Sequence, residues 1–107
     1  MASGTIPYDS AAQISSTYRN SMAGNASKAL TLRAETNLGF IVTGAADSTK
    51  KGLFVFATSS TGTTGWVEKI MGGTHPSVSF SDGVLTISNG GSGYLFYGIV
   101  FMYGGVA

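Results

Sequence analysis

The stretch SVSFSDGVLTIS, residues 77–88, contains the signal that most restricts the fold. Its Asp82-Gly83 dipeptide is favoured in the two-residue type I′ turn of a β-hairpin, because both turn positions need a positive φ. With the turn at these two residues, Phe80 lies opposite Leu85. That register places four apolar side chains on one face of the hairpin: Val78, Phe80, Leu85 and Ile87. The turn chemistry and the hydrophobic pattern therefore predict the same pairing of the two strands.

Further apolar runs lie outside the hairpin, and loops rich in Gly, Ser, Thr and Asn separate them. We expect strands in ALTLRAE (29–35), LGFIVTG (38–44), LFVFAT (53–58), WVEKIM (66–71) and YLFYGIVFMY (94–103). With the two arms of the hairpin they make about seven strands, which is typical of an antiparallel β-sandwich or small jelly roll. We therefore expect an all-β fold, a jelly-roll-like antiparallel β-sandwich.

The first 26 residues, MASGTIPYDSAAQISSTYRNSMAGNA, contain few β-branched side chains. Four larger or apolar side chains recur at helical spacing: Ala11, Ile14, Tyr18 and Met22. Ser10 and Gln13 have the spacing of a capping box, whereas the Ser-Ser-Thr run is a weak helix former. A short helix and an extended arm both remain open. We divide the 107-residue chain into an N-terminal arm or short helix (1–26) and one β-sandwich domain (27–107).

The composition is poor in charge. Charged residues make up 10% of the chain, against about 25% in a typical soluble domain, so much of the surface is either hidden in an assembly or covered with hydroxyl and amide groups. The six basic residues are scattered and the net charge is +1, so we expect no nucleic-acid partner. The absence of cysteine excludes disulfides and thiolate metal sites. MASGTIPYDS lacks the features of a signal peptide, so we expect synthesis in a cytoplasm.

Two of the expected strands are apolar on both faces, LFVFA and the closing run. In the closing run one face holds Leu95, Tyr97, Ile99, Phe101 and Tyr103, and the other holds Tyr94, Phe96, Gly98, Val100 and Met102. A two-layer sandwich buries one face of a strand, so the second needs another cover: the N-terminal arm, another subunit or lipid. Ten residues are too few for a membrane helix, and a membrane barrel needs at least about eight such strands. We therefore expect no membrane insertion and a homo-oligomer, with an interface formed by Phe54, Phe56, Phe96, Gly98, Val100 and Met102.

Catalytic constellations are lacking in the sequence. The single histidine, His75, precedes a proline in the loop GGTHPS, where an exposed loop histidine is the simplest interpretation and a general base or metal ligand is the alternative. The carboxylates are scattered: Asp9, Glu35, Asp47, Glu68 and Asp82. Asp82 is explained by the hairpin turn, and no spacing suggests a metal site. We expect no enzyme, no catalytic residue, no bound metal and no cofactor.

Sugar binding is a further possibility, because small β-sandwiches often hold glycans on exposed aromatic rings. The candidate glycan-binding residues are Trp66, His75 and Tyr94. Trp66 is the only tryptophan, and a place in the core or in an interface is the alternative for it. Two loops, 59–65 and 89–93, have the Gly, Ser and Thr content of plain hairpin loops or of a binding surface.

The order of the last three pieces resembles the small trimeric β-sandwich knobs at the ends of bacteriophage tail fibre and receptor-binding proteins. These pieces are VSFSDGVLTISN (78–89), a Gly/Ser turn (90–93) and the apolar strand (94–103). The resemblance covers residues 29–107 in layout and about the last 30 in wording. It implies a trimer, other virion proteins as partners, location in the virion and contact with a host-surface glycan. The shaft repeats of a full fibre are missing, which leaves a decoration protein or a separate knob.

Three hypotheses follow. The first is a phage virion structural protein, an oligomeric β-sandwich acting as a fibre knob, tail-tip or capsid decoration component. The second is a stand-alone carbohydrate-binding module. The third is a small β-sandwich enzyme with His75 as its base.

Overall fold

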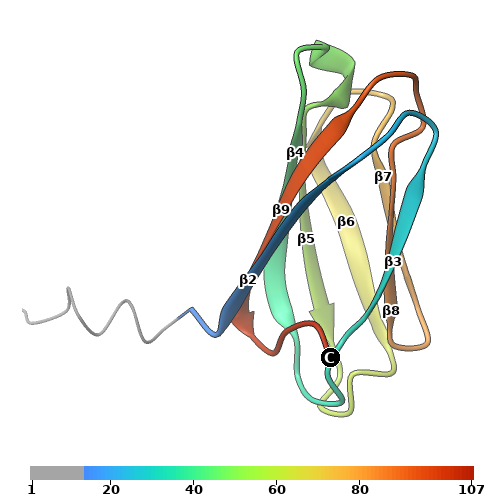
Figure 1. Ribbon diagram of the computed structural model, residues 1–107. Coiled ribbons are helices and arrows are strands. Elements are labelled where there is room, and N and C mark those ends of the chain that lie inside the picture. The colour runs from blue at the N-terminus through green and yellow to red at the C-terminus, as the bar shows by residue number, and fades with distance from the viewer. Residues whose placement is uncertain (1–13) are drawn as a thin grey trace, which may run out of the picture.

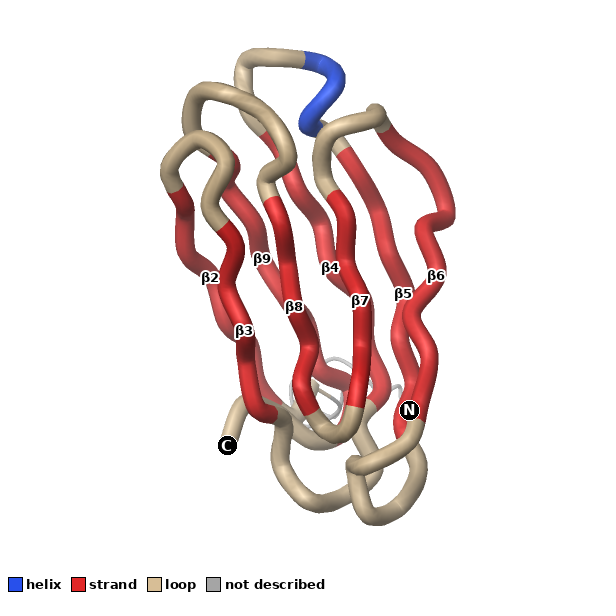
Figure 2. Tube along the Cα trace, turned by 90° about the vertical axis from the view of Figure 1, so that its right-hand side faces the viewer, coloured by secondary structure: helices blue, strands red, loops and turns tan. Residues whose placement is uncertain are grey.

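The computed structural model describes residues 14–107, which form two antiparallel sheets packed face to face (Figure 1). The strands are β2 (Ser16–Met22), β3 (Ser27–Thr31), β4 (Leu38–Gly44), β5 (Gly52–Thr58), β6 (Gly65–Gly72), β7 (Ser77–Ser81), β8 (Val84–Ser88) and β9 (Leu95–Tyr103), and a 3₁₀ turn, η1 (Ser48–Lys50), precedes β5. One sheet has the order β2-β9-β4-β5-β6 and the other the order β3-β8-β7. Figure 2 shows the three-stranded sheet in front of the five-stranded one. The expected all-β antiparallel sandwich is confirmed.

The hairpin of β7 and β8 has the predicted register, with Phe80 paired with Leu85. Asp82 (φ 51°) and Gly83 (φ 83°) both have the positive φ that a type I′ turn requires. Leu85 and its neighbour on the same face, Ile87, are completely buried, whereas the partner side chains on β7 are half-buried against the same core. The prediction for this element is confirmed in turn, register and buried face.

The segment that the sequence left open between helix and arm is a paired strand over residues 16–22. β2 lies at the edge of the five-stranded sheet and pairs with β9, with Tyr18 opposite Ile99. Tyr18 and Met22 are four residues apart, a spacing that fits one face of a helix and also one face of a strand, where alternate residues share a side. Both side chains pack against the core. The extended alternative is therefore correct for residues 16–22; Ser10, Ala11 and Gln13 lie outside the described residues.

The core lies between the sheets. Its members are Met22, Leu30, Leu32, Ile41, Phe54, Phe56, Leu85, Ile87, Leu95, Tyr97, Ile99 and Phe101. Phe54 and Phe56, which we expected in a subunit interface, are 2% and 3% exposed and belong to this core. The reason is the register of β5, which sets Phe54 opposite the buried Ile41 and Phe56 opposite Gly39. A Cβ at Gly39 would lie 3.0 Å from the Phe56 ring, so this glycine gives the ring its space.

The end of β9 departs from the predicted alternation. Leu38 pairs with Tyr103 while Gly39 pairs with Phe101, so Met102 is an extra residue in β9 at this point. The bulge turns Tyr103 outward, and it is 61% exposed instead of lying on the inner face with Phe101. ALTLRAE also differs from expectation, since β3 ends at Thr31 and the chain turns in residues 33–37.

A completely buried asparagine, Asn37, holds one end of the sandwich together. Its Nδ2 donates to the carbonyls of Arg33 (3.0 Å) and Glu35 (2.8 Å), and its Oδ1 accepts from the backbone N–H of Gly105 (2.9 Å). Its own backbone N–H donates to Oγ1 of Thr58 at 2.9 Å. One side chain thus joins the β3–β4 connection to the segment after β9.

We expect Asn37→Ala to lower the free energy of unfolding by about 2–4 kcal/mol, because it leaves several buried backbone groups without partners. Asn20→Ala is the control, since Asn20 is exposed and its side chain accepts only from the neighbouring Ser21 N–H. The control should change stability by less than about 0.5 kcal/mol. Urea denaturation measures both, and equal effects would contradict the role of Asn37.

The raised pKa of Tyr97 makes the free energy of unfolding depend on pH in the alkaline range. Burial raises the pKa of Tyr97 to about 12, and the neighbouring Tyr18 ring, whose centroid is 6.2 Å away, adds to the shift. An unfolded tyrosine has a pKa of about 10. A raised folded-state pKa means that the stabilising contribution is complete below about pH 10 and is lost as the pH rises through about 12.

We therefore expect Tyr97→Phe to lose less free energy of unfolding than the wild type between about pH 9 and about pH 11.5. Tyr103→Phe, at an exposed position, should lose as much as the wild type. Urea denaturation at the two pH values measures the difference. Identical losses in all three proteins would contradict a raised pKa of Tyr97 in the folded state.

Candidate functional site

The most unusual surface of the molecule is the side of the five-stranded sheet that points away from the small sheet. We call it the outer face. The alternation of β9 places Leu95, Tyr97, Ile99 and Phe101 inward. By the strand registers, the outer face consists of Thr17, Arg19, Ser21, Leu38, Phe40, Val42, Gly44, Leu53, Val55, Ala57, Trp66, Glu68, Met71, Phe96, Gly98, Val100 and Tyr103.

The outer face is apolar and open. Phe96 is 60% exposed, Met71 66% and Val42 51%, and no segment within residues 14–107 covers them. An antiparallel sheet with one face in water normally carries polar residues on that face. Here the only charged members are Arg19 and Glu68, on the two edge strands β2 and β6. Contiguous exposed apolar surface of this kind marks an interaction site.

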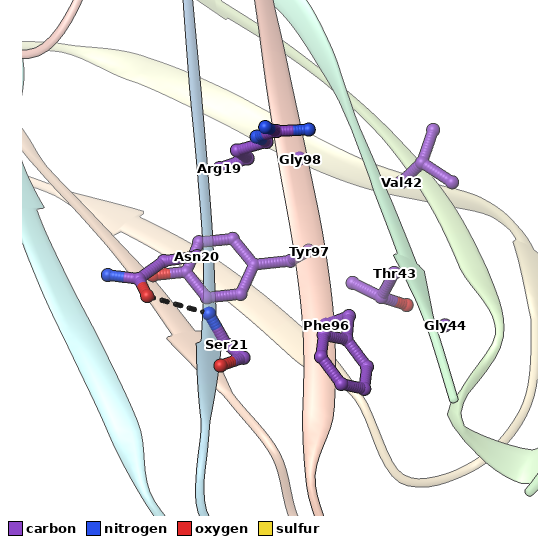
Figure 3. A pocket seen from close by; sticks show the side chains of 9 residues that line it. All are labelled: Arg19, Asn20, Ser21, Val42, Thr43, Gly44, Phe96, Tyr97 and Gly98. Atoms are coloured by element: carbon purple, nitrogen blue, oxygen red, sulfur yellow. Dashed lines mark hydrogen bonds between the residues drawn. The ribbon is translucent and has the colours of Figure 1, made fainter. Parts of the chain in front are cut away.

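A shallow groove of about 640 Å³ crosses the outer face at Gly98. The register sets Arg19 on one side of Gly98 and Val42 on the other, and Figure 3 shows the two side chains flanking the glycine with Phe96 beside it. A Cβ added at Gly98 or at Gly44 would find no atom within 4 Å. The missing side chains therefore leave a gap in an otherwise continuous apolar layer.

The structure places the expected interface residues in two different environments. Phe96, Gly98 and Val100 lie on the outer face, as the alternation of the closing run predicts, and Met102, the extra residue of the β9 bulge, is 51% exposed. The two β5 phenylalanines lie in the core, where they cannot meet a partner. The apolar β5 residues that do face outward are Leu53, Val55 and Ala57, one position away from those we named.

The three candidate glycan-binding residues do not come together. Trp66 is 53% exposed at the start of β6, near the end of the sandwich that holds the Asp82-Gly83 turn. His75 follows β6 and Tyr94 precedes β9, at the opposite end, which carries η1 (Figure 2). The whole length of β6 separates Trp66 from the other two.

His75 is half-buried and hydrogen-bonded, in contrast to the expected exposed loop histidine. Its Nδ1 lies 2.9 Å from Oγ1 of Thr49, and that hydroxyl donates to Oδ1 of Asp47 at 2.7 Å. Because the hydroxyl has one proton, His75 Nδ1 is the donor to Thr49. The ring also packs on Gly91, where a Cβ would lie 2.9 Å from Nδ1. His75 therefore joins the loop before β7 to η1 and to the loop before β9.

Two residues of this end were not singled out by the sequence. Lys50 is 2% exposed, and its Nζ donates to the carbonyl oxygens of Ser92 and Gly93. Asp47 accepts from both the N–H and the hydroxyl of Thr49, and these hydrogen bonds lower the pKa of the Asp47 carboxyl. The Asp-x-Thr spacing is a signal for such a turn. Nothing in the sequence distinguishes the buried Lys50 from the exposed Lys51.

Within residues 14–107, no three histidine or carboxylate side chains lie close enough to hold a metal ion. In the same range no helix is long and apolar enough to cross a membrane.

Thr49 is the one side chain of the described part that hydrogen-bonds to the His75 ring, so the ring is oriented by a hydroxyl that itself donates to Asp47.

No protein-family model matches the sequence, and no curated protein matches it. Among solved structures, the chain is similar to a tailspike protein, gp49 of Acinetobacter baumannii bacteriophage Fri1, described as a capsular polysaccharide depolymerase. The identity is 11%, the TM-score is 0.50, and the match covers 79% of this chain and 17% of the tailspike. The tailspike of Acinetobacter phage vB_ApiP_P1 matches with 12% identity and a TM-score of 0.39, over 84% of this chain and 22% of that one. At such identities the first likeness shows a shared fold, and the chain spans about a fifth of either tailspike's length.

Proposed function

We propose that this protein is a structural β-sandwich of a bacteriophage particle, which self-associates through its outer face and contacts a glycan on the host surface. A fibre knob, a tail-tip component and a capsid decoration protein are the places in a virion that fit such a module. The observation that supports the proposal best is the exposed apolar outer face. The fold shared with part of a phage tailspike and the resemblance of residues 78–103 to fibre knobs point in the same direction.

Self-association follows from the chemistry of the outer face. Burying one exposed side chain of the size of Phe96 contributes about 1.5–3 kcal/mol, and several such side chains lie next to one another. The two charged members, Arg19 and Glu68, lie on the edge strands, so the part of the face formed by β4 and β5 can leave water without burying a charge. A second copy of the chain presents the same apolar chemistry. We propose a homotrimer, the state that the resemblance to fibre knobs implies.

We further propose a binding and structural role without catalysis. The tailspike of phage Fri1 is described as a depolymerase, but this chain matches only 17% of that protein. The His75 ring is held by Thr49, in an arrangement that supports three loops. A catalytic base would need a nucleophile or substrate group within hydrogen-bond reach, and the loop contacts account for the position of the ring without one.

A stand-alone carbohydrate-binding module is the second candidate. It is favoured by Trp66, whose ring is 53% exposed on the outer face and available to a sugar. The two candidates differ in mass in solution. A module that binds sugar alone is a monomer of 11.0 kDa, whereas the virion protein is a multiple of that mass.

We expect light scattering after size-exclusion chromatography to give about three times the mass of one chain. Gly98→Glu should reduce the complex to monomers, because its side chain fills the groove between Arg19 and Val42 and holds the two contacting surfaces apart. The isolated domain has space for this side chain, so its thermal unfolding should change little.

Ser79→Glu is the matched control, because Ser79 is an exposed residue of β7 in the other sheet. This variant should keep the wild-type mass. A wild-type monomer would refute self-association, and a Gly98→Glu protein of unchanged mass would place the interface on another surface.

A further inference from the structure

A second hollow lies at the rim of the outer face, at the end of the sandwich that carries η1. Its volume is about 300 Å³, at the lower end of the range of small-molecule sites. It lies between the β4–η1 connection and the start of β9, and its lining consists of Ala45, Ala46, Asp47, Lys50, Ser92, Gly93, Tyr94 and Phe96. Phe96 also lines the groove at Gly98, so this ring separates the two hollows.

The base of the hollow is fixed by buried polar contacts. The Nζ of Lys50 donates to the carbonyls of Ser92 and Gly93, the second at 2.9 Å. The Nδ2 of Asn89, a completely buried residue, donates to the same Gly93 carbonyl at 2.8 Å and to that of Ala23 at 2.9 Å. These contacts hold the loop that leads into Tyr94. The hollow is therefore formed before any ligand arrives, which reduces the entropy cost of binding.

One wall of the hollow presents a carboxylate. Oδ1 of Asp47 accepts from the N–H of Thr49 at 2.9 Å and from its hydroxyl at 2.7 Å. Within the described part of the chain, the other carboxylate oxygen has no hydrogen bond, and Asp47 is exposed. The hydrogen bonds from Thr49 lower the pKa of Asp47, so the group stays ionised. It is an oriented acceptor for hydroxyl groups.

Two aromatic residues also line the hollow. Tyr94 is 64% exposed at the rim of the outer face, whereas Phe96 is shared with the surface that we propose for self-association, so the accessible ring is that of Tyr94. The face of an aromatic ring is electron-rich and attracts the polarised C–H groups on one side of a sugar ring. An aromatic ring and an ionised acceptor in one hollow suit a molecule with C–H groups on one side and hydroxyl groups at its edge.

We propose that this hollow binds a neutral hexopyranose unit of a bacterial surface polysaccharide, with the sugar stacked on Tyr94 and its hydroxyls donating to Asp47. This inference rests on the proposed glycan contact and assigns it to a place. Lys50 is buried and occupied by carbonyls, so the accessible charge of the hollow is the negative one of Asp47. Uronic acids are therefore repelled, and neutral hexoses are preferred. Trp66, at the other end of β6, takes no part.

The test uses the wild-type protein in its solution assembly and isothermal titration with three neutral probes: oligosaccharides of dextran, mannan and galactan. Oligogalacturonate is the acidic probe. We expect at least one neutral probe to bind and the acidic probe to bind at least about tenfold more weakly. Tyr94→Ala should weaken binding about tenfold or more, as loss of an aromatic anchor does.

Asp47→Asn should also weaken binding about tenfold, because a hydrogen bond to a charged acceptor is replaced by one to a neutral acceptor. Asparagine keeps an oxygen for Thr49, so the loop is preserved. Two matched controls lie at the far end of the sandwich. Tyr103→Ala removes an equally exposed tyrosine, and Asp82→Asn removes one carboxylate at a turn position where asparagine is favoured. Both should bind like the wild type.

Three outcomes would overturn the inference. They are no binding of any neutral probe, tighter binding of oligogalacturonate than of the neutral probes, and equal losses of affinity in Tyr94→Ala and Tyr103→Ala. Binding that depends on Trp66 and is unchanged in Tyr94→Ala would overturn it as well, while leaving glycan contact in place. Self-association is measured separately, by the mass in solution. Absence of sugar binding in the hollow and absence of the proposed assembly therefore give different results.

Discussion

Side chains on a β-strand point alternately to opposite faces of the sheet, and in β9 both faces carry apolar groups. β9 lies between β2 and β4, so its backbone is paired on both sides. Its inward residues form much of the core, together with the inward residues of β4, β5 and the small sheet. Its outward residues form part of the outer face. Folding and the proposed assembly thus depend on opposite sides of the same strand, and the small sheet can bury only one of them.

The two ends of the sandwich are fixed by buried amide side chains. At one end Asn37 joins the β3–β4 connection to the segment after β9. At the other end Asn89 and Lys50 hold the loop before β9 through backbone carbonyls. Buried polar groups are costly unless they are hydrogen-bonded, so these contacts restrict the loops to one arrangement. The hollow beside Tyr94 owes its shape to the second set.

Local sequence patterns predicted where the strands and turns lie more reliably than they predicted whether a given side chain faces the core or the outer face. The β7–β8 hairpin was predicted with its register because turn chemistry and alternation agree. The spacing of Tyr18 and Met22 fits a helix and a strand equally, and pairing with β9 decides between them. In β5 the alternation was recognisable, but every residue of LFVFA is apolar, so the sequence could not indicate which set, Phe54 and Phe56 or their neighbours, faces the core.

The sequence by itself determined the class of fold, the hairpin and the two apolar faces of the closing run, because each depends on residues close together in the chain. Only the tertiary structure decided that Trp66 and Tyr94 lie at opposite ends, that Lys50 is buried, and that Asp47, Tyr94 and Phe96 surround one hollow. These facts depend on loops that are distant in sequence and meet only when the sheets pack. Long-range packing leaves no periodic trace in the sequence, which is why the hollow beside Tyr94 is defined only in the folded chain.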